Sequence, residues 1–383
     1  MTRVTDFHPA APHELTKLFP TDEIPAEPKL NLPKHAGLVA LGALIWSWVL
    51  QAEASQGLQG AAEFDKPFFI VCFNHTAPVV LLPLLVGYFW FHGEEEDRLA
   101  PLDCVRVLER HSVIPLPKLW RIAAFLSAFY CVTDYFWYAA LANVSVAAGT
   151  AIFNCSPLFV YCFSICFLHE RLSFGKMCGV FTSFAGVTLV VMFQNGDDLD
   201  AIADTGVVAG LMVVLSAALY GGYEVAIRLT MGDDITDTAT LLTMTGLCGL
   251  FTIPMWIVGS ALLAYSPIEA LYEPLGLPDN THGLVLLLVS GLMSIIFCVF
   301  LPLSLCWTSP LETSVGCMLT IPLSGIVDTV VHDTSFSWEC IGGSVLVMGG
   351  FGILEYCSVT GTPLQSEPRK TSEDMTTLAN PLA

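Results

Sequence analysis

Long apolar runs constrain this chain more than any other feature. An α-helix needs about 20 apolar residues to cross a hydrocarbon layer roughly 30 Å thick. Because lipid supplies no hydrogen-bond partners, each such run is expected to be a helix. We place ten runs, at residues 36–52, 67–91, 119–142, 144–168, 174–193, 206–229, 238–264, 283–306, 311–331 and 337–357. The predicted fold class is an all-α integral membrane protein with ten transmembrane helices.

Composition agrees with a membrane protein and excludes several other classes. Hydrophobic residues make up 54% of the chain and charged residues 13%, whereas soluble domains are roughly 25% charged. With a net charge of −20 and no basic patch, the chain is not expected to bind nucleic acid. The cysteines lie singly in apolar runs with no Cys-x-x-Cys pair, as reduced core cysteines do. No metal-ligand or catalytic cluster is visible, so neither a cofactor nor an enzymatic activity is expected.

The basic residues predict the orientation in the membrane. If the ten helices alternate in direction and the chain starts in the cytoplasm, only Lys66 of the 15 Lys and Arg residues lies on the far side. Cytoplasmic segments are enriched in Lys and Arg, so both termini are expected to be cytoplasmic. Residues 1–35 and 358–383 are expected to be disordered tails, because they cannot bury enough apolar surface. The sequence leaves open whether the membrane is the plasma membrane or an endomembrane.

The chain also contains an internal repeat. Two turns, at His169 and His332, share one spacing. In each, a glycine follows the histidine by ten residues, and a second glycine follows the first by seven. The two turns lie on opposite sides of the membrane in the predicted topology. Residues 36–193 and 205–357 are therefore expected to form two inverted five-helix repeats, which is an architecture of alternating-access carriers.

Asp134 is the strongest candidate for a functional residue. A carboxylate at bilayer depth costs roughly 2.5–3.5 kcal/mol on insertion scales, so it needs a reason. Asp134 lies between Tyr130 and Tyr138, whose rings could bind a cation or stack on a flat solute. His75 could exchange protons with Asp134 if their helices meet. The alternatives are a carboxylate satisfied by tyrosine hydroxyls and a histidine that is simply hydrogen-bonded.

Polar residues beside two prolines form a second candidate group. A proline frees a backbone carbonyl in the preceding turn, so the segments around Pro157 and Pro322 could present acceptors to a solute. Asp328, six residues after Pro322, is assigned to the same site. The remaining side chains predicted to bind solute there are Asn154, Ser156, Thr320 and Ser324. The alternatives are kinked packing for the proline segments and an interfacial position near a helix end for Asp328.

Four segments carry a family resemblance. They are TDYFWYAALANVSVAAGTAIFNCSPLFVYCFS (133–164), FLHERLSFGKMCGVFTSFAGV (167–187), SAALYGGYEVAIRL (216–229) and LTIPLSGIVD (319–328). In their order they resemble the drug/metabolite transporter superfamily of the EamA type, and within it the F branch of the nucleotide-sugar-transporter-like solute carriers with its thiamine-transporter-like members. The resemblance implies ten helices, a cavity lined by helices one to four and six to nine, and peripheral helices five and ten that allow a homodimer contact.

The sequence therefore predicts a secondary transporter of a small organic solute that works by alternating access in the lipid bilayer. No basic residue lies deep in a run, and phosphorylated substrates need Arg or Lys clamps, which favours a neutral or cationic solute. The resemblance suggests a cationic or aromatic metabolite such as a thiamine-like vitamin. Two alternatives stay open: an exchanger of nucleotide sugars or other metabolites, and a transport-inactive membrane scaffold that uses the 92–118 loop.

Overall fold

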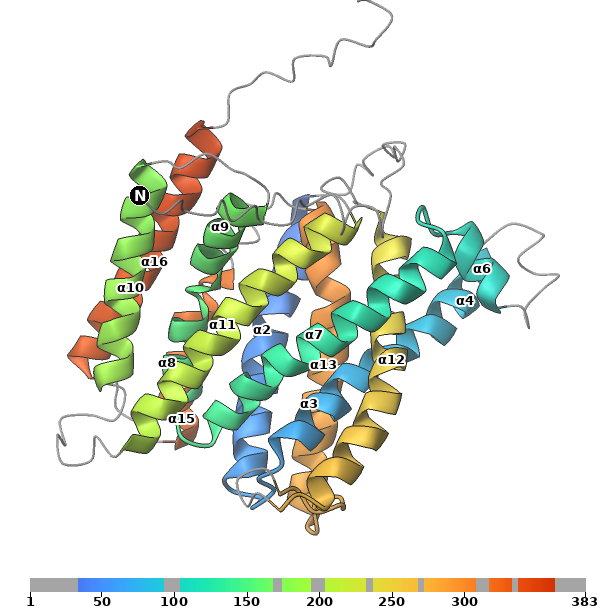
Figure 1. Ribbon diagram of the computed structural model, residues 1–383, viewed down its shortest axis with the longest axis horizontal. Coiled ribbons are helices and arrows are strands. Elements are labelled where there is room, and N and C mark those ends of the chain that lie inside the picture. Colours follow the sequence, from blue (N-terminus) through green and yellow to red (C-terminus); the bar gives the residue numbers. More distant parts are fainter. Residues whose placement is uncertain are drawn as a thin grey trace, which may run out of the picture.

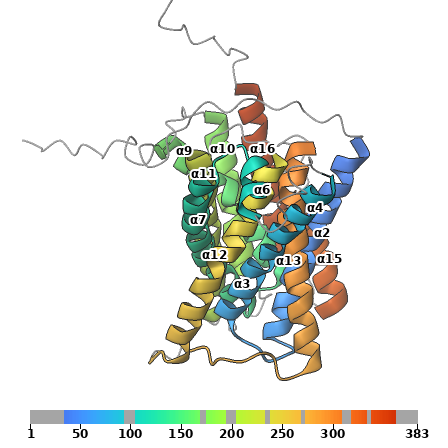
Figure 2. The same ribbon diagram turned by 90° about the vertical axis from the view of Figure 1, so that its right-hand side faces the viewer.

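The protein is a bundle of helices. The computed structural model describes residues 34–92, 104–167, 174–193, 204–231, 237–267, 272–307, 317–332 and 337–361, and within them it contains helices and no β-strand. Most of the helices run along the height of the bundle (Figure 1), and the view turned by 90° shows the same arrangement (Figure 2). The helices are α2 (Lys34–Gln59), α3 (Pro67–Thr76), α4 (Leu81–His92), α6 (Cys104–Arg110), α7 (Leu116–Leu141), α8 (Val146–Phe153), α9 (Ser156–Phe167), α10 (Phe174–Phe193), α11 (Asp204–Met231), α12 (Thr238–Ala264), α13 (Thr281–Trp307), α15 (Thr320–His332) and α16 (Trp338–Gly361).

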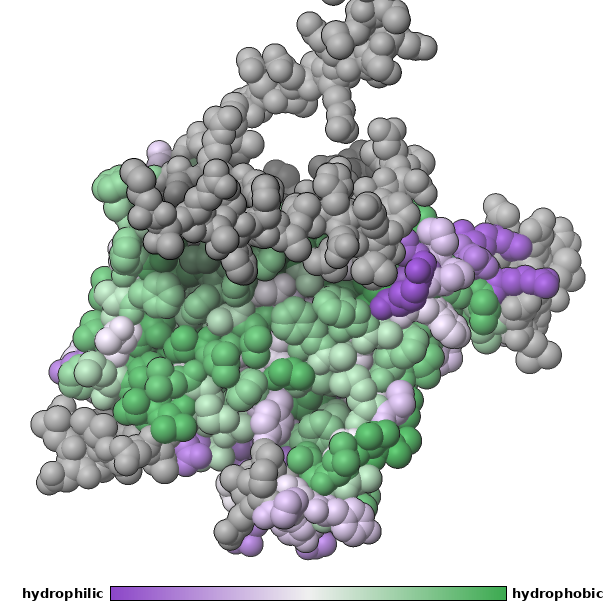
Figure 3. All heavy atoms as spheres, in the orientation of Figure 1, coloured by the Kyte–Doolittle hydropathy of each residue, from purple (hydrophilic) through white to green (hydrophobic). Residues whose placement is uncertain are grey.

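The described helices are apolar enough for a membrane. Seven segments have the length and composition to cross one: 36–59, 67–92, 146–167, 174–193, 206–231, 238–264 and 281–301. Two shorter apolar helices cover 320–331 and 338–353. Hydrophobic residues cover most of the flank seen in Figure 3, while hydrophilic residues gather toward its ends. The chain is therefore an all-α, multi-pass membrane protein.

Helix α2 is longer than the predicted run 36–52, because it continues to Gln59. Its last two turns carry amide side chains that bind the end of α7. The Gln56 Nε2 donates to the carbonyl oxygens of Leu141 and Val144 at 3.0 and 2.7 Å. The last carbonyls of a helix have no partner inside it, so Gln56 satisfies the carbonyl of Leu141 at the end of α7. The contacts lie where α2 and α7 end and α3 and α8 begin, which we call the lower end of the bundle (Figure 1).

Proline interrupts the helices at three places. A 3₁₀ turn at Ala77–Val80, which contains Pro78, joins α3 to α4. Helices α8 and α9 are separated at residues 154 and 155, because Pro157 has no backbone N–H to continue the ladder. Pro322 lies in the first turn of α15. This helix starts at Thr320, whereas the predicted run started at residue 311. Residues 311–316 lie outside the described part of the chain. Pro254 lies inside α12 without ending it.

Helices α10 and α16 form the most extensive contact between two helices in the described structure. Glycines allow their backbones to touch. A Cβ atom on Gly186 would lie 2.5 Å from the carbonyl oxygen of Gly343, and one on Gly350 would lie 2.6 Å from that of Gly179. Small residues permit such close crossings in membranes. These glycines therefore serve a contact within the chain, and the homodimer through the same helices stays a prediction.

Candidate functional site

The centre of the site is a contact between α3 and α7. The His75 Nε2 lies 2.8 Å from the Asp134 Oδ2. The two side chains are 9% and 13% exposed, respectively. His75 lies in the candidate span 67–92, whereas α7, which carries Asp134, is not among the seven candidate spans. A buried ionisable side chain is retained where it has a partner, and each of these residues is the other's partner. The structure thus brings together the two residues predicted to exchange protons. Since imidazole and carboxylate can each bind a proton, the pair is chemically able to take one up and release it.

Aromatic rings cover one side of this pair. The Tyr130 ring lies 4.3 Å from the His75 ring and stacks on the Tyr223 ring at 4.8 Å with an interplanar angle of 15°. Tyr220 lies 6.2 Å from Tyr130 and 5.2 Å from Phe153, measured between ring centroids. We call Tyr130, Tyr220 and Tyr223 the tyrosine cluster. Electron-rich ring faces beside a carboxylate suit a cation or a flat aromatic solute.

The sequence did not predict the contribution of α11 to this cluster. Its signal is the pair of glycines between Tyr220 and Tyr223. A Cβ atom on Gly221 would lie 2.8 Å from the Phe159 Cβ and 2.9 Å from the backbone nitrogen of Val160. Only a glycine allows α11 to approach α9 so closely. The two tyrosines are thereby held beside Tyr130.

Tyr138 lies outside the tyrosine cluster. It is 2% exposed, and its hydroxyl accepts hydrogen bonds from the Gln51 Nε2 at 2.8 Å and the Asn74 Nδ2 at 3.0 Å. The Asn74 amide is also hydrogen-bonded to the Ser290 hydroxyl, and Ser290 to Ser55. Buried polar groups need such partners. The Tyr138 hydroxyl is thus used in a hydrogen-bond network joining α2, α3, α7 and α13.

The residues around the two prolines make no hydrogen bond to the His75–Asp134 pair in the described part of the chain. Asn154 follows Phe153, which contacts Tyr220, and its Nδ2 donates to the Thr150 carbonyl at 2.7 Å. The Thr320 hydroxyl donates to the Cys317 carbonyl at 2.5 Å. Ser156 and Ser324 are buried. Among the described residues, no hydrogen bond joins any of these side chains to the pair.

Asp328 lies at the lower end of the bundle and not beside the pair. It is fully buried, and its Oδ2 accepts the backbone N–H of Ala147 at 2.7 Å. The Ser145 hydroxyl accepts the next N–H, that of Ala148. The first N–H groups of a helix have no partner inside it and carry partial positive charge. Asp328 therefore caps α8, a role that the sequence did not predict.

A second carboxylate caps a helix at the same end. Glu273 accepts the N–H groups of Phe68 and Phe69 at the start of α3, at 2.9 and 3.1 Å. Burial raises the pKa of Glu273, although the two N–H groups oppose that rise. Burial also lowers the pKa of the nearby Lys66, whose Nζ donates to the Gly276 carbonyl at 3.3 Å. The sequence did not indicate Glu273, because acidic residues are common in loops.

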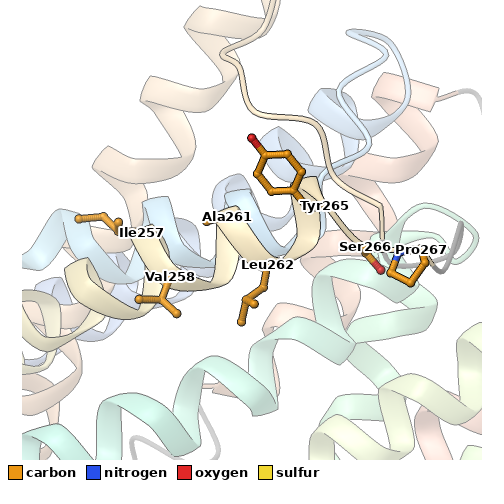
Figure 4. A pocket seen from close by; sticks show the side chains of 7 residues that line it. All are labelled: Ile257, Val258, Ala261, Leu262, Tyr265, Ser266 and Pro267. Carbon is orange, nitrogen blue, oxygen red and sulfur yellow. The ribbon is translucent and has the colours of Figure 1, made fainter.

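A surface hollow at the lower end of α12 does not involve this site. It is lined by Ile257, Val258, Ala261, Leu262, Tyr265, Ser266 and Pro267 (Figure 4). Ile257 and Leu262 are more than half exposed, as residues facing lipid are. The part of the chain that the structure describes holds no group of three or more His, Cys, Asp or Glu residues able to bind a metal ion.

Comparison with known proteins identifies the class. Residues 101–192 match the EamA-like transporter family. An "Uncharacterized transporter C405.03c" of Schizosaccharomyces pombe is 26% identical over 84% of this chain and 96% of its own length. "Solute carrier family 35 member F5" of Pongo abelii is 28% identical over 65% of this chain and 46% of its own length. The "Thiamine-repressible mitochondrial transport protein THI74" of Saccharomyces cerevisiae is 27% identical over 82% of this chain and 90% of its own length.

These matches confirm the resemblance to the drug/metabolite transporter superfamily and to the F branch of solute carrier family 35. The relatives carry the names of transporters and not of enzymes, so the expectation that the chain is not an enzyme is also confirmed.

Proposed function

From this kinship with membrane transporters, we propose that the chain is a secondary transporter that carries a small organic solute by alternating access. The observation that carries the proposal is the His75–Asp134 pair inside the bundle, with the tyrosine cluster beside it. Ionisable groups inside transmembrane helices mark solute or proton pathways. In this mechanism Asp134 and Tyr130 bind the solute, and His75 with Asp134 couples its movement to a proton.

We further propose ten spans arranged as two inverted repeats, 36–193 and 205–357. In this arrangement α2, α3–α4, α7, α8–α9 and α10 correspond to α11, α12, α13, α15 and α16. Helix contacts then come in matching pairs. Contact of α2 with α13 corresponds to that of α11 with α7, and contact of α3 with α13 to that of α12 with α7. Three further contacts each join a helix to its own counterpart in the other repeat: α3–α12, α8–α15 and α10–α16. This pairing supports a twofold relation between the halves.

With ten spans both tails, 1–35 and 358–383, lie on one side of the membrane, and the basic residues favour the cytoplasm. The lower end of the bundle is then the outer end. Protease protection of tags at the two ends in intact vesicles tests this orientation. Digestion of only one tag would contradict it.

The solute class follows from the groups at the site. A carboxylate next to stacked tyrosines favours a cation that has an aromatic ring. One relative is named as a thiamine-repressible transport protein, and thiamine is a cationic aromatic molecule. A thiamine-like vitamin is therefore our first candidate. Asn154, Ser156, Thr320 and Ser324 are proposed to supply polar contacts from the proline segments when the solute is bound.

Uptake into proteoliposomes containing the purified protein tests the proposal. We expect saturable uptake of labelled thiamine, with a rate at least tenfold lower in Asp134→Asn. The matched control is Asp65→Asn, which removes an exposed loop carboxylate and should leave uptake unchanged. Uptake of a nucleotide sugar that does not depend on Asp134 would favour the exchanger alternative and refute the proposed site. No uptake of any cation, nucleotide sugar or other metabolite would favour the scaffold.

A further inference from the structure

The interface between α3 and α7 also holds two cysteines. Cys72 lies three residues before His75 on α3, and Cys131 lies three residues before Asp134 on α7. Residues three apart share one face of a helix, so each helix presents a cysteine beside its ionisable residue. Both thiols are reduced and buried, with exposures of 0% and 4%.

Cys131 contacts the nitrogen of His75 that Asp134 does not. The Cys131 Sγ lies 4.0 Å from the His75 Nδ1, while the Asp134 Oδ2 lies 2.8 Å from the Nε2. The two nitrogens of one ring are therefore contacted from α7 by residues one helical turn apart. The Cys131 thiol also interacts with the Cys72 thiol and the Thr252 hydroxyl, so its position is fixed from several sides.

The chemistry of imidazole makes these two contacts depend on each other. A neutral histidine carries hydrogen on one nitrogen and a lone pair on the other, and its partners decide which. An ionised Asp134 accepts hydrogen bonds only, so the Nε2 must carry the hydrogen. The Nδ1 then needs a donor, and a thiol has one S–H to donate.

We propose that Cys131 is a positioning residue of the proton-binding pair, whose thiol holds neutral His75 in the tautomer that donates to Asp134. When His75 binds a further proton, the Nδ1 becomes a donor and can no longer accept the Cys131 S–H, so the contact favours the neutral ring over the protonated one. The proton comes from water or solute and no covalent bond to sulfur forms. The inference rests on the proposed coupling role of His75 and Asp134.

Other titratable groups surround the pair but do not replace this contact. They are Tyr130 and Tyr138 on α7, Cys72 on α3, Cys248 on α12, Cys298 on α13, and Tyr220 and Tyr223 on α11. Among the described residues, the hydrogen-bond partner of the Nδ1 is Cys131. By contrast, the buried thiol of Cys340 on α16 interacts with a backbone carbonyl, that of Val190, at 3.9 Å. Cys340 is therefore a matched control.

Infrared spectroscopy of the purified protein without solute tests the contact directly. The difference between wild type and Cys131→Val isolates the S–H stretching band of Cys131, which lies at lower frequency when the thiol donates a hydrogen bond. We expect the band to move to higher frequency in His75→Phe, while the Cys340 band stays in place. Should His75→Phe not fold, His75→Leu, which has no hydrogen-bond acceptor in its side chain, takes its place. A Cys131 band that is absent, or that ignores the loss of His75, would overturn the inference.

Transport gives a second readout. Cys131→Ala should displace the pH at which uptake is half-maximal by about 0.5 unit or more, as expected when one neutral hydrogen bond to the ring is lost. Cys131→Ser, which keeps a donor and acceptor, should stay closer to wild type, and Cys340→Ala should equal it. If Cys131→Ala has the wild-type pH profile, the thiol does not position His75. If no solute is transported, the proposed function fails while the infrared result still decides the role of Cys131.

Discussion

The crossing of α10 and α16 allows a sharp test of how the bundle is held together. In Gly350→Ala the new Cβ atom would lie 2.6 Å from both the Gly179 carbonyl oxygen and the Ser183 nitrogen. Both are backbone atoms that cannot rotate away, so the helices must separate. Overpacking of this kind costs about 1–3 kcal/mol, and alanine regains about 1 kcal/mol of helix propensity over glycine. The difference is a net destabilisation of up to about 2 kcal/mol.

The adjacent glycine provides the control. A Cβ atom on Gly349 meets nothing within 4 Å, so Gly349→Ala should be neutral or slightly stabilising. Thermal unfolding in detergent can be followed with a dye that reacts with exposed thiols. Cys340 is 2% exposed on α16 and interacts with the Val190 carbonyl on α10, so its labelling reports separation of the two helices. Equal stability of Gly350→Ala and Gly349→Ala would refute the reasoning.

Three further changes test the polar contacts by the same unfolding measurement. Asn74→Leu leaves Tyr138 and Ser290 without their shared partner and should lower the free energy of unfolding by about 1–3 kcal/mol. If Asn74→Leu is as stable as Gly349→Ala, the network does not stabilise the fold. Asp328→Ala removes the cap of α8 and should cost about 1–2 kcal/mol, with part regained in Asp328→Asn; identical stability of both variants would argue against capping. Burial raises the pKa of Glu273 from 4.5, so the folded chain binds a proton there more readily than the unfolded chain. The stability that Glu273 contributes is therefore greatest at low pH and is lost as pH rises through its raised pKa. The stability advantage of wild type over Glu273→Gln should shrink as the pH rises above 4.5, and growth of that advantage would exclude the effect.

Much of the helix content could be predicted because the length of an apolar run is a local property of the sequence. Helices α10 and α12 have the bounds of the predicted runs, 174–193 and 238–264. Prolines also indicated the break between α8 and α9. The end of α2 could not be predicted from apolar run length, since Gln56 is polar and its partners, the carbonyls of Leu141 and Val144, are distant in sequence.

The site was predictable in its ionisable residues and not in its surroundings. Charged groups are costly in lipid, so Asp134 and His75 are conspicuous in sequence. Tyr130 and Tyr138 flank Asp134 at equal distances along the chain, yet only the packing of α3 against α7 decides that Tyr130 meets the His75 ring and Tyr138 meets Asn74. The contact of Asp328 with the start of α8 could not be predicted, because Ala147 is distant from it in sequence.

The two acidic caps at the lower end give the bundle a particular way to part. Glu273 and Asp328 both belong to the second half of the chain, whereas the helices they hold, α3 and α8, belong to the first. In the proposed alternating access the halves move apart at this end, and each carboxylate then exchanges backbone amides for water at a net cost of about 1.5–3 kcal/mol per hydrogen bond. Two contacts of this kind would favour the closed end, and their release would not require any helix to unwind.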